Sequence, residues 1–129
     1  MDTFSRFLSA VFFCFIIWII YLADSGTNSV FFGLVKALPH GDKIGHLILF
    51  GLLALGANTF FKLRRFRVGG TEMFVGTCLV IGFVTMEELS QYCIPSRTFD
   101  PFDLLANMVG IVVFSFISNT PKLRLIANK

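Results

Sequence analysis

The stretch FLSAVFFCFIIWIIYLA, residues 7–23, decides the fold class because it runs for seventeen residues without a charge. It is longer than the ~7–15-residue apolar region of a signal peptide, and no A-x-A cleavage site follows it. Trp18 and Tyr21, near its end, suit the aromatic belt found where a helix leaves the bilayer. We therefore predict that residues 7–23 form a transmembrane helix that the mature protein retains.

The composition of the whole chain is that of a membrane protein. Hydrophobic residues make up 55% of the 129 residues, charged residues make up 15%, and Phe occurs 17 times. A soluble domain carries about 25% charged residues, so this chain lacks the polar surface that water requires. The net charge of +3 comes from basic residues between apolar runs, with no basic, aromatic-interleaved helix for stacking on bases. We predict the lipid bilayer as the main partner and no nucleic-acid binding.

Three further apolar runs follow, each close to the ~20 residues that span the hydrocarbon of a bilayer. They cover residues 44–61, 71–92 and 102–118. Backbone polar groups in lipid must be paired within the spanning structure, so each run is predicted to be a helix. The prediction is an all-α integral membrane protein, a four-transmembrane-helix bundle with one domain over residues 1–129. The apolar segment 30–38 is too short to span and is predicted to lie on the membrane surface or to dip into it.

The distribution of Lys and Arg predicts the orientation of the bundle. Of the 11 basic residues, one side carries Lys36, Lys43 and Arg97, and the other carries Arg6, Lys62, Arg64, Arg65, Arg67, Lys122, Arg124 and Lys129. Cytoplasmic segments of membrane proteins carry the excess of Lys and Arg. Both termini are therefore predicted to be cytoplasmic, and loops 24–43 and 93–101 are predicted to be extracytoplasmic.

Polar residues gather at the predicted outer ends of the second, third and fourth helices. Polar groups at membrane depth normally face the bundle interior or a watery cavity, so we predict that they meet in a shallow, outward-facing site. His46, Glu88 and Asp103 are the catalytic candidates, because imidazole and carboxylate groups can move protons. The predicted substrate-binding residues are Asp42, Lys43, His46, Glu88, Gln91, Arg97, Asp100, Asp103 and Asn107.

Several of these residues also have a purely structural interpretation. Asp42 suits a helix N-terminus, and Glu88 with Gln91 could clamp two helices together. Arg97 could fix its loop by ion pairs with nearby carboxylates, or its guanidinium could bind phosphate. Gly110 could allow a close approach of two helices. Asp42, His46, Glu88 and Asp103 are ligand types that suit Mg²⁺, Mn²⁺ or Zn²⁺, which keeps a metal site as an alternative. No local metal-binding motif such as HExxH supports it, so we predict no metal site and name no cofactor.

Two spaced blocks of these residues carry a resemblance to a known family. The blocks read Asp42-Lys43-x-x-His46 with Phe50, and Glu88-x-x-Gln91 followed by Pro95-x-Arg97-x-x-Asp100-x-x-Asp103-x-x-x-Asn107-x-x-Gly110. Over residues 42–110 the chain resembles the VanZ-like family of bacterial membrane proteins. The resemblance implies a location in the bacterial cytoplasmic (inner) membrane. It also implies a role in the cell envelope, because the named member is associated with low-level resistance to the glycopeptide teicoplanin.

Three functions are compatible with this pattern. The first is a site that binds or modifies an anionic or glycosylated lipid-linked envelope substrate. The second is a non-catalytic membrane scaffold, in which the polar residues specify helix packing. The third, a small transporter, is disfavoured because transporters usually place an ionisable group near the midplane, and the 7–23 run has none. The oligomeric state is left open.

Overall fold

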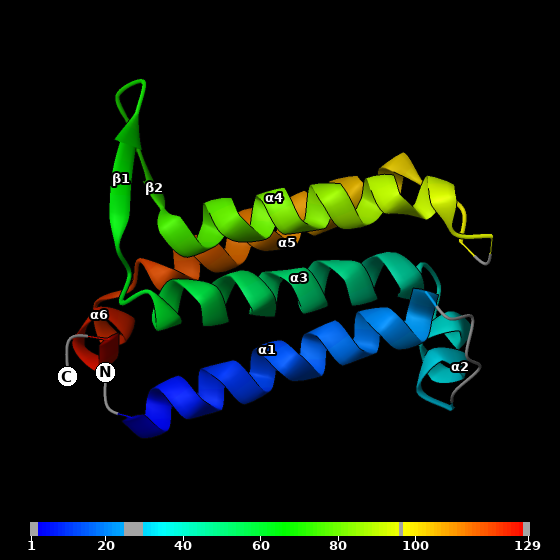
Figure 1. Cartoon of the computed structure of the whole chain (residues 1–129), viewed down its shortest axis with the longest axis horizontal. Helices are drawn as coiled ribbons and strands as arrows, with labels where there is room; N and C mark the ends of the chain where they lie inside the picture. Colours follow the sequence, from blue (N-terminus) through cyan, green and yellow to red (C-terminus); the bar gives the residue numbers. More distant parts are fainter. Residues whose placement is uncertain (1–2, 25–29, 96, 128–129) are drawn as a thin grey trace.

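The computed structural model describes residues 3–24, 30–95 and 97–127, and it shows a bundle of four long helices (Figure 1). These are α1 (Thr3–Asp24), α3 (Gly41–Phe60), α4 (Val75–Ser90) and α5 (Pro101–Ser118). Shorter elements are α2 (Val30–Ala37), the 3-10 helix η1 (Gln91–Cys93), α6 (Pro121–Ala127), and the strands β1 (Arg65–Val68) and β2 (Thr71–Phe74). Residues 25–29 of the predicted loop 24–43, Ser96 of loop 93–101, and Lys129 of the basic tail lie outside the described residues.

Helix α3 is the centre of the bundle, with α1 on one side and the α4–α5 pair on the other (Figure 1). The apolar core comprises Ile16, Phe50, Leu53, Ala54, Val80, Val84 and Ile111. Glycine allows α3 and α5 to approach closely, because a Cβ at Gly110 would overlap the backbone of Leu47. The close-packing role considered for Gly110 is thus present in the structure.

The chain is mostly helical, and two described helices, α3 and α5, are long and apolar enough to cross a membrane. Helix α1 contributes the shorter apolar segment Arg6–Leu22. Helix α4 has 16 residues, which makes it about 24 Å long at ~1.5 Å per residue. By length and composition alone, two of the four predicted spans are therefore matched.

The prediction of an all-α chain is wrong between α3 and α4, where β1 and β2 form an antiparallel hairpin. Val68 pairs with Thr71 across Gly69 and Gly70, which have φ values of 54° and 86°. Two-residue turns with positive φ at both positions are the favoured connection of a hairpin. The helix predicted over 71–92 therefore begins at Val75, and its last residues form η1 instead. A Gly-Gly pair between short runs is a hairpin signal that the sequence contained.

The bundle exposes large apolar side chains and buries polar ones. Exposed fractions reach 66% at Phe7, 74% at Met86 and 73% at Phe116, whereas Glu88 and Asn107 are fully buried. Monomeric soluble proteins rarely expose large contiguous apolar surfaces. The surface of this bundle thus suits a lipid environment, in agreement with the composition.

The two ends of the bundle carry different loops (Figure 1). The beginning of α1, the β-hairpin and α6 lie at one end, and α2 with the loop after η1 lies at the other. The described basic residues of the predicted cytoplasmic side are therefore at the first end. The predicted binding residues are at the second end. The basic residues and the binding residues therefore lie at opposite ends of the bundle, as the order of the helices along the chain predicts.

Candidate functional site

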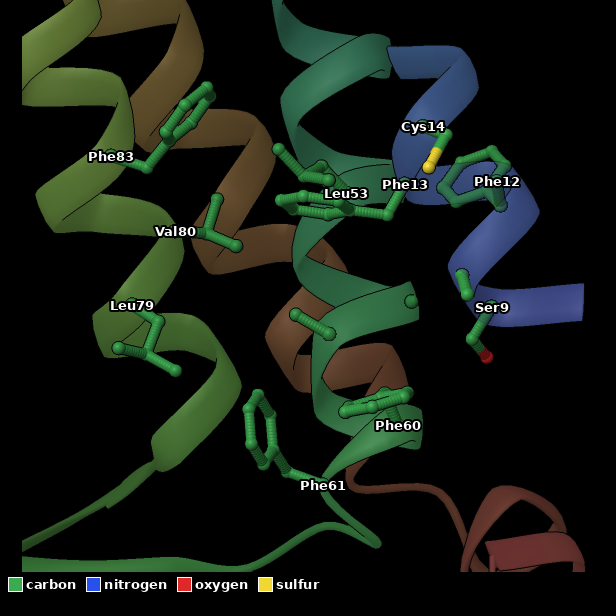
Figure 2. A pocket seen from close by; sticks show the side chains of 13 residues that line it. Ser9, Phe12, Phe13, Cys14, Leu53, Phe60, Phe61, Leu79, Val80 and Phe83 are labelled. Carbon is green, nitrogen blue, oxygen red and sulfur yellow. The ribbon is translucent and has the colours of Figure 1, made fainter. Parts of the chain in front are cut away.

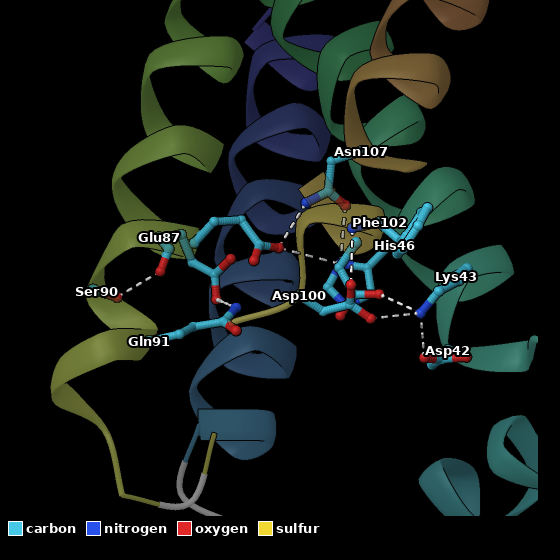
Figure 3. Close-up of polar contacts among 11 residues, drawn as sticks. Asp42, Lys43, His46, Glu87, Ser90, Gln91, Asp100, Phe102 and Asn107 are labelled. Atoms are coloured by element: carbon cyan, nitrogen blue, oxygen red, sulfur yellow. Dashed lines mark hydrogen bonds and ion pairs between the residues drawn. The ribbon is translucent and has the colours of Figure 1, made fainter. Parts of the chain in front are cut away.

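Lys43, in the first turn of α3, holds three carboxylates together (Figure 3). Its Nζ donates to Asp42 Oδ2 at 3.1 Å, to Asp100 Oδ2 at 2.9 Å and to Asp103 Oδ1 at 3.1 Å. Asp100 is also the N-cap of α5, and its Oδ1 accepts the backbone N–H of Phe102 at 2.9 Å. One ammonium therefore joins the start of α3 to the start of α5.

The position of Asp100 lowers its pKa. The hydrogen bond from Lys43 is the largest cause, and the backbone N–H of Phe102 adds to it. A carboxyl group whose pKa is lowered by folding stabilises the fold above its unfolded pKa of about 3.9. That contribution is lost as the pH falls through the lower folded pKa. The ion pair between Asp100 and Lys43 is thus present at neutral pH.

Replacing Lys43 with methionine should therefore destabilise the fold in a pH-dependent way. Without the ammonium, three neighbouring carboxylates repel one another at neutral pH. We expect a lower melting temperature than wild type at pH 7, and a difference that shrinks once the pH falls below about 4, where the carboxylates take up protons. Circular dichroism in detergent measures this. Lys122→Met, at the other end of the bundle, is the control and should show no such pH trend.

Deeper in the bundle, Asn107 joins His46 of α3 to Glu88 of α4. Its Nδ2 donates to Glu88 Oε1 at 2.8 Å, and its Oδ1 lies 2.9 Å from His46 Nδ1. Because the carboxylate takes the NH₂ group of Asn107, the amide oxygen is left to accept from His46. The Nδ1 atom of His46 therefore carries hydrogen, and Nε2 faces Asp103 Oδ2 at 3.8 Å.

Among the buried acceptor atoms at this end, two lie on side chains that are at most 2% exposed and have no hydrogen-bond partner among the described residues. They are Glu88 Oε2 and Gln91 Oε1, on side chains that are 0% and 2% exposed. Gln91 uses its Nε2 to donate to Glu87 Oε1 at 3.2 Å. Leaving a buried acceptor without a hydrogen bond destabilises the folded state by about 1–3 kcal/mol. A ligand that donates hydrogen bonds to these two atoms would remove that penalty.

The structure brings most of the predicted site residues together. Asp42 is at the exposed rim and contacts Lys43. Arg97 is half-buried in the loop between η1 and α5. The residues that share direct contacts are Asp42, Lys43, His46, Glu88, Asp100, Asp103 and Asn107. Gln91 follows Glu88 by three residues and bonds to Glu87 instead.

The charge of this cluster is dominated by acids. Four predicted site residues carry carboxylates (Asp42, Glu88, Asp100 and Asp103), and two carry fixed positive charges (Lys43 and Arg97). The ammonium of Lys43 already contacts three of the carboxylates. The site therefore offers more acceptors than donors. Among the described residues, no group of three or more His, Cys, Asp or Glu side chains is arranged to hold a metal ion.

Sequence reasoning missed a second buried polar cluster, at the opposite end of the same three helices. Asn58 Nδ2 donates to Thr77 Oγ1 at 2.9 Å and to Ser118 Oγ at 3.1 Å, and Thr77 Oγ1 lies 2.7 Å from Ser115 Oγ. A Cβ at Gly76 would come within 2.5 Å of the α3 backbone. These four side chains bond to one another, so the cluster holds helices together.

Comparison with known proteins adds a relative without an assigned activity. No family model matches the chain, and no solved structure matches it. The chain is similar to an uncharacterised protein of the fission yeast Schizosaccharomyces pombe, with 36% identity over 84 residues. The match covers 64% of this chain and 50% of the relative, so the chain spans about half the length of the curated protein it matches. The VanZ-like resemblance stays a prediction.

Proposed function

We propose that the chain is a membrane protein whose four long helices all cross the bilayer, with both termini in the cytoplasm. The exposed apolar side chains of α1 and α4, such as Phe7 and Met86, support spans beyond α3 and α5. The described basic residues at one end of the bundle support the orientation. The polar site then opens on the extracytoplasmic side.

Cysteine accessibility tests this orientation. In a chain that lacks its three native cysteines, Arg64→Cys and Lys122→Cys should react with a membrane-impermeant maleimide only after the cells are opened. Pro95→Cys, in the loop after η1, should react in intact cells. Labelling of Arg64→Cys or Lys122→Cys from outside would reverse the orientation and place the site in the cytoplasm.

The site itself is proposed to bind the polar headgroup of a lipid-linked molecule. The observation that carries this is that two almost fully buried acceptors, Glu88 Oε2 and Gln91 Oε1, have no hydrogen-bond partner among the described residues. Hydroxyl groups of a sugar would donate to them. Of the two headgroup classes predicted, a glycosylated one fits better than a purely anionic one, because Lys43 is occupied by carboxylates. Binding needs only these hydrogen bonds. His46, Glu88 and Asp103 are the groups that a bond-breaking activity would use.

The cellular role is proposed from the resemblance to VanZ-like proteins. It is a role in the bacterial cell envelope, at the cytoplasmic (inner) membrane, with an effect on susceptibility to glycopeptides such as teicoplanin. The relative from a fission yeast shows that similar chains occur outside bacteria. The proposal therefore rests on a lipid-linked glycosyl headgroup, a class of molecule that is not confined to bacterial envelopes.

Glu88→Gln is the sharpest test of the headgroup site. It keeps the size of the side chain and the acceptor for Asn107, but turns the unpaired acceptor into an NH₂ donor. We expect at least a tenfold loss of binding to nanodiscs that contain a monoglycosyl diacylglycerol. Glu72→Gln, on the exposed hairpin, is the control and should bind like wild type.

The competing function is a membrane scaffold that binds no ligand. The contacts of Lys43 and Asn107 favour it, because they join helices. Both residues tie α3 to its neighbours and would do so in a purely structural protein. The scaffold predicts equal glycolipid binding by wild type and Glu88→Gln at equal folded yield. It also predicts no glycolipid enrichment over phosphatidylcholine in the purified wild type.

A further inference from the structure

A second feature lies away from the polar site, as an apolar cavity in the other half of the bundle (Figure 2). It has a volume of about 370 Å³ and lies between α1, α3 and α4. Its walls include Phe12 and Phe13 of α1, Phe60 of α3, and Leu79, Val80 and Phe83 of α4. Small-molecule sites have volumes of about 300–1,000 Å³, so the cavity has the capacity of a ligand site.

The lining of the cavity restricts what can occupy it. Apart from the hydroxyl of Ser9 and the thiol of Cys14, the side chains that line it are apolar. Gly56 forms part of the α3 wall, where a Cβ would already come within 3.3 Å of Phe12. The occupant must therefore be hydrocarbon, and the volume is far smaller than a helix of about 10 Å diameter needs. A hydrocarbon chain fits both conditions.

The charges at the same end indicate what the hydrocarbon is attached to. Arg6 is exposed and three residues before Ser9, so the two share a face of α1. Lys62 is exposed and directly follows Phe61, which also lines the cavity. Basic side chains beside a membrane attract the phosphates of anionic lipids. An acyl chain in the cavity would place its phosphate at these two cations.

The geometry points to a binding site for an anionic phospholipid of the leaflet at the basic end, with one acyl chain between α1 and α4 and its phosphate against Arg6 and Lys62. This site rests on the proposed insertion into a bilayer, but not on the headgroup site at the other end. It assigns the face of α1 that carries Phe12 and Phe13 to a bound lipid.

Photocrosslinking tests the site. The protein is placed in nanodiscs containing a phosphatidylglycerol with a diazirine on its acyl chain, and labelled peptides are measured by mass spectrometry. We expect labelling of residues 9–14 and 79–83 to exceed that of the exposed α5 residues Val112 and Phe116 at least fivefold. A phosphatidylcholine probe should label the cavity at least threefold less than the anionic probe.

Matched variants make the test specific. Gly56→Leu and Leu79→Trp both fill the cavity, from α3 and from the exposed wall of α4, and each should reduce its labelling at least fivefold. Gly82→Leu is the control, since nothing lies within 4 Å of a Cβ there, and it should label like wild type. Arg6→Gln with Lys62→Gln should abolish the preference for the anionic probe.

Three outcomes would overturn the inference. Equal labelling of the cavity and of α5 would mean that only the general lipid annulus is present. A preference unchanged by the Arg6 and Lys62 replacements would remove the headgroup assignment. Labelling of α5 without any labelling of the cavity would show that lipid does not occupy the cavity, as expected if a second copy of the chain covers it. Absence of labelling on all helices would instead refute insertion into the bilayer. The result for Glu88→Gln tests only the headgroup site at the other end and does not bear on this lipid site.

Discussion

Asn107→Ala is expected to destabilise the fold by about 3 kcal/mol, the scale for leaving buried polar and charged partners unpaired. The side chain of Asn107 is fully buried and provides the 2.8 Å hydrogen bond to Glu88 and the 2.9 Å contact with His46. Its removal leaves neither carboxylate oxygen of Glu88 with a hydrogen-bond donor among the described residues, since His46 Nδ1 lies 3.8 Å from Oε1. Unfolding by SDS in mixed micelles, followed by circular dichroism, measures the change.

Two comparisons make the Asn107 result interpretable. Val109→Ala, at an exposed neighbour on α5, should cost less than about 0.5 kcal/mol. In a Glu88→Gln background the cost of Asn107→Ala should fall, because contacting residues are energetically coupled and the buried carboxylate is gone. A loss below about 1 kcal/mol in the wild-type background would show that water replaces the amide, and that the inner part of the site is already hydrated.

Gly110→Ala is expected to cost about 3 kcal/mol, near the upper end for overpacking. The added methyl would overlap the Leu47 carbonyl group and its neighbouring backbone atoms. Backbone cannot rotate aside as a side chain can, so α3 and α5 must separate along their shared contact. Their separation would also lengthen the contacts of Lys43 and His46 with α5, and glycolipid binding should fall along with stability.

Gly82→Ala is the matched control for Gly110→Ala, and its predicted effect has the opposite sign. Gly82 is exposed on α4, with nothing within 4 Å of a Cβ. In a helix interior alanine is favoured over glycine by about 1 kcal/mol. The same substitution should therefore stabilise one helix and destabilise the other. Equal effects at the two positions would mean that α3 and α5 are not in close contact in the membrane.

Much of the bundle could be predicted because apolar runs in a chain of this composition leave few alternatives. The runs around Phe50 and Ile111 became the helices α3 and α5 within a few residues of the predicted limits. The hairpin was missed because β2 was included in the apolar run 71–92 and β1 in the basic loop before it. The turn chemistry of Gly69 and Gly70, which joins the two strands, was not used as a signal. Helix α6 was missed for a simpler reason, since the tail has too few apolar residues to show a period.

The sequence predicted which residues belong to the site, but not which contacts they make with one another. Helix spacing put His46, Glu88, Asp103 and Asn107 at corresponding ends of three helices. It could not show that Lys43 joins three carboxylates, or that Asn107 stands between His46 and Glu88. It also placed no residue of the Asn58 cluster, whose members are single polar residues in otherwise apolar helices.

The sequence by itself determined that the chain is helical, apolar on its surface and polar at corresponding ends of its helices. These properties follow from the composition and from the spacing of apolar and polar residues within each segment. Neither depends on how one helix packs against another. Only the tertiary structure decided that Glu88 Oε2 and Gln91 Oε1 lack donors among the described residues, and where α1 and α4 leave a cavity beside α3. Those properties depend on the distance and rotation between helices, which are set by contacts such as Gly110 on Leu47 between residues far apart in the chain.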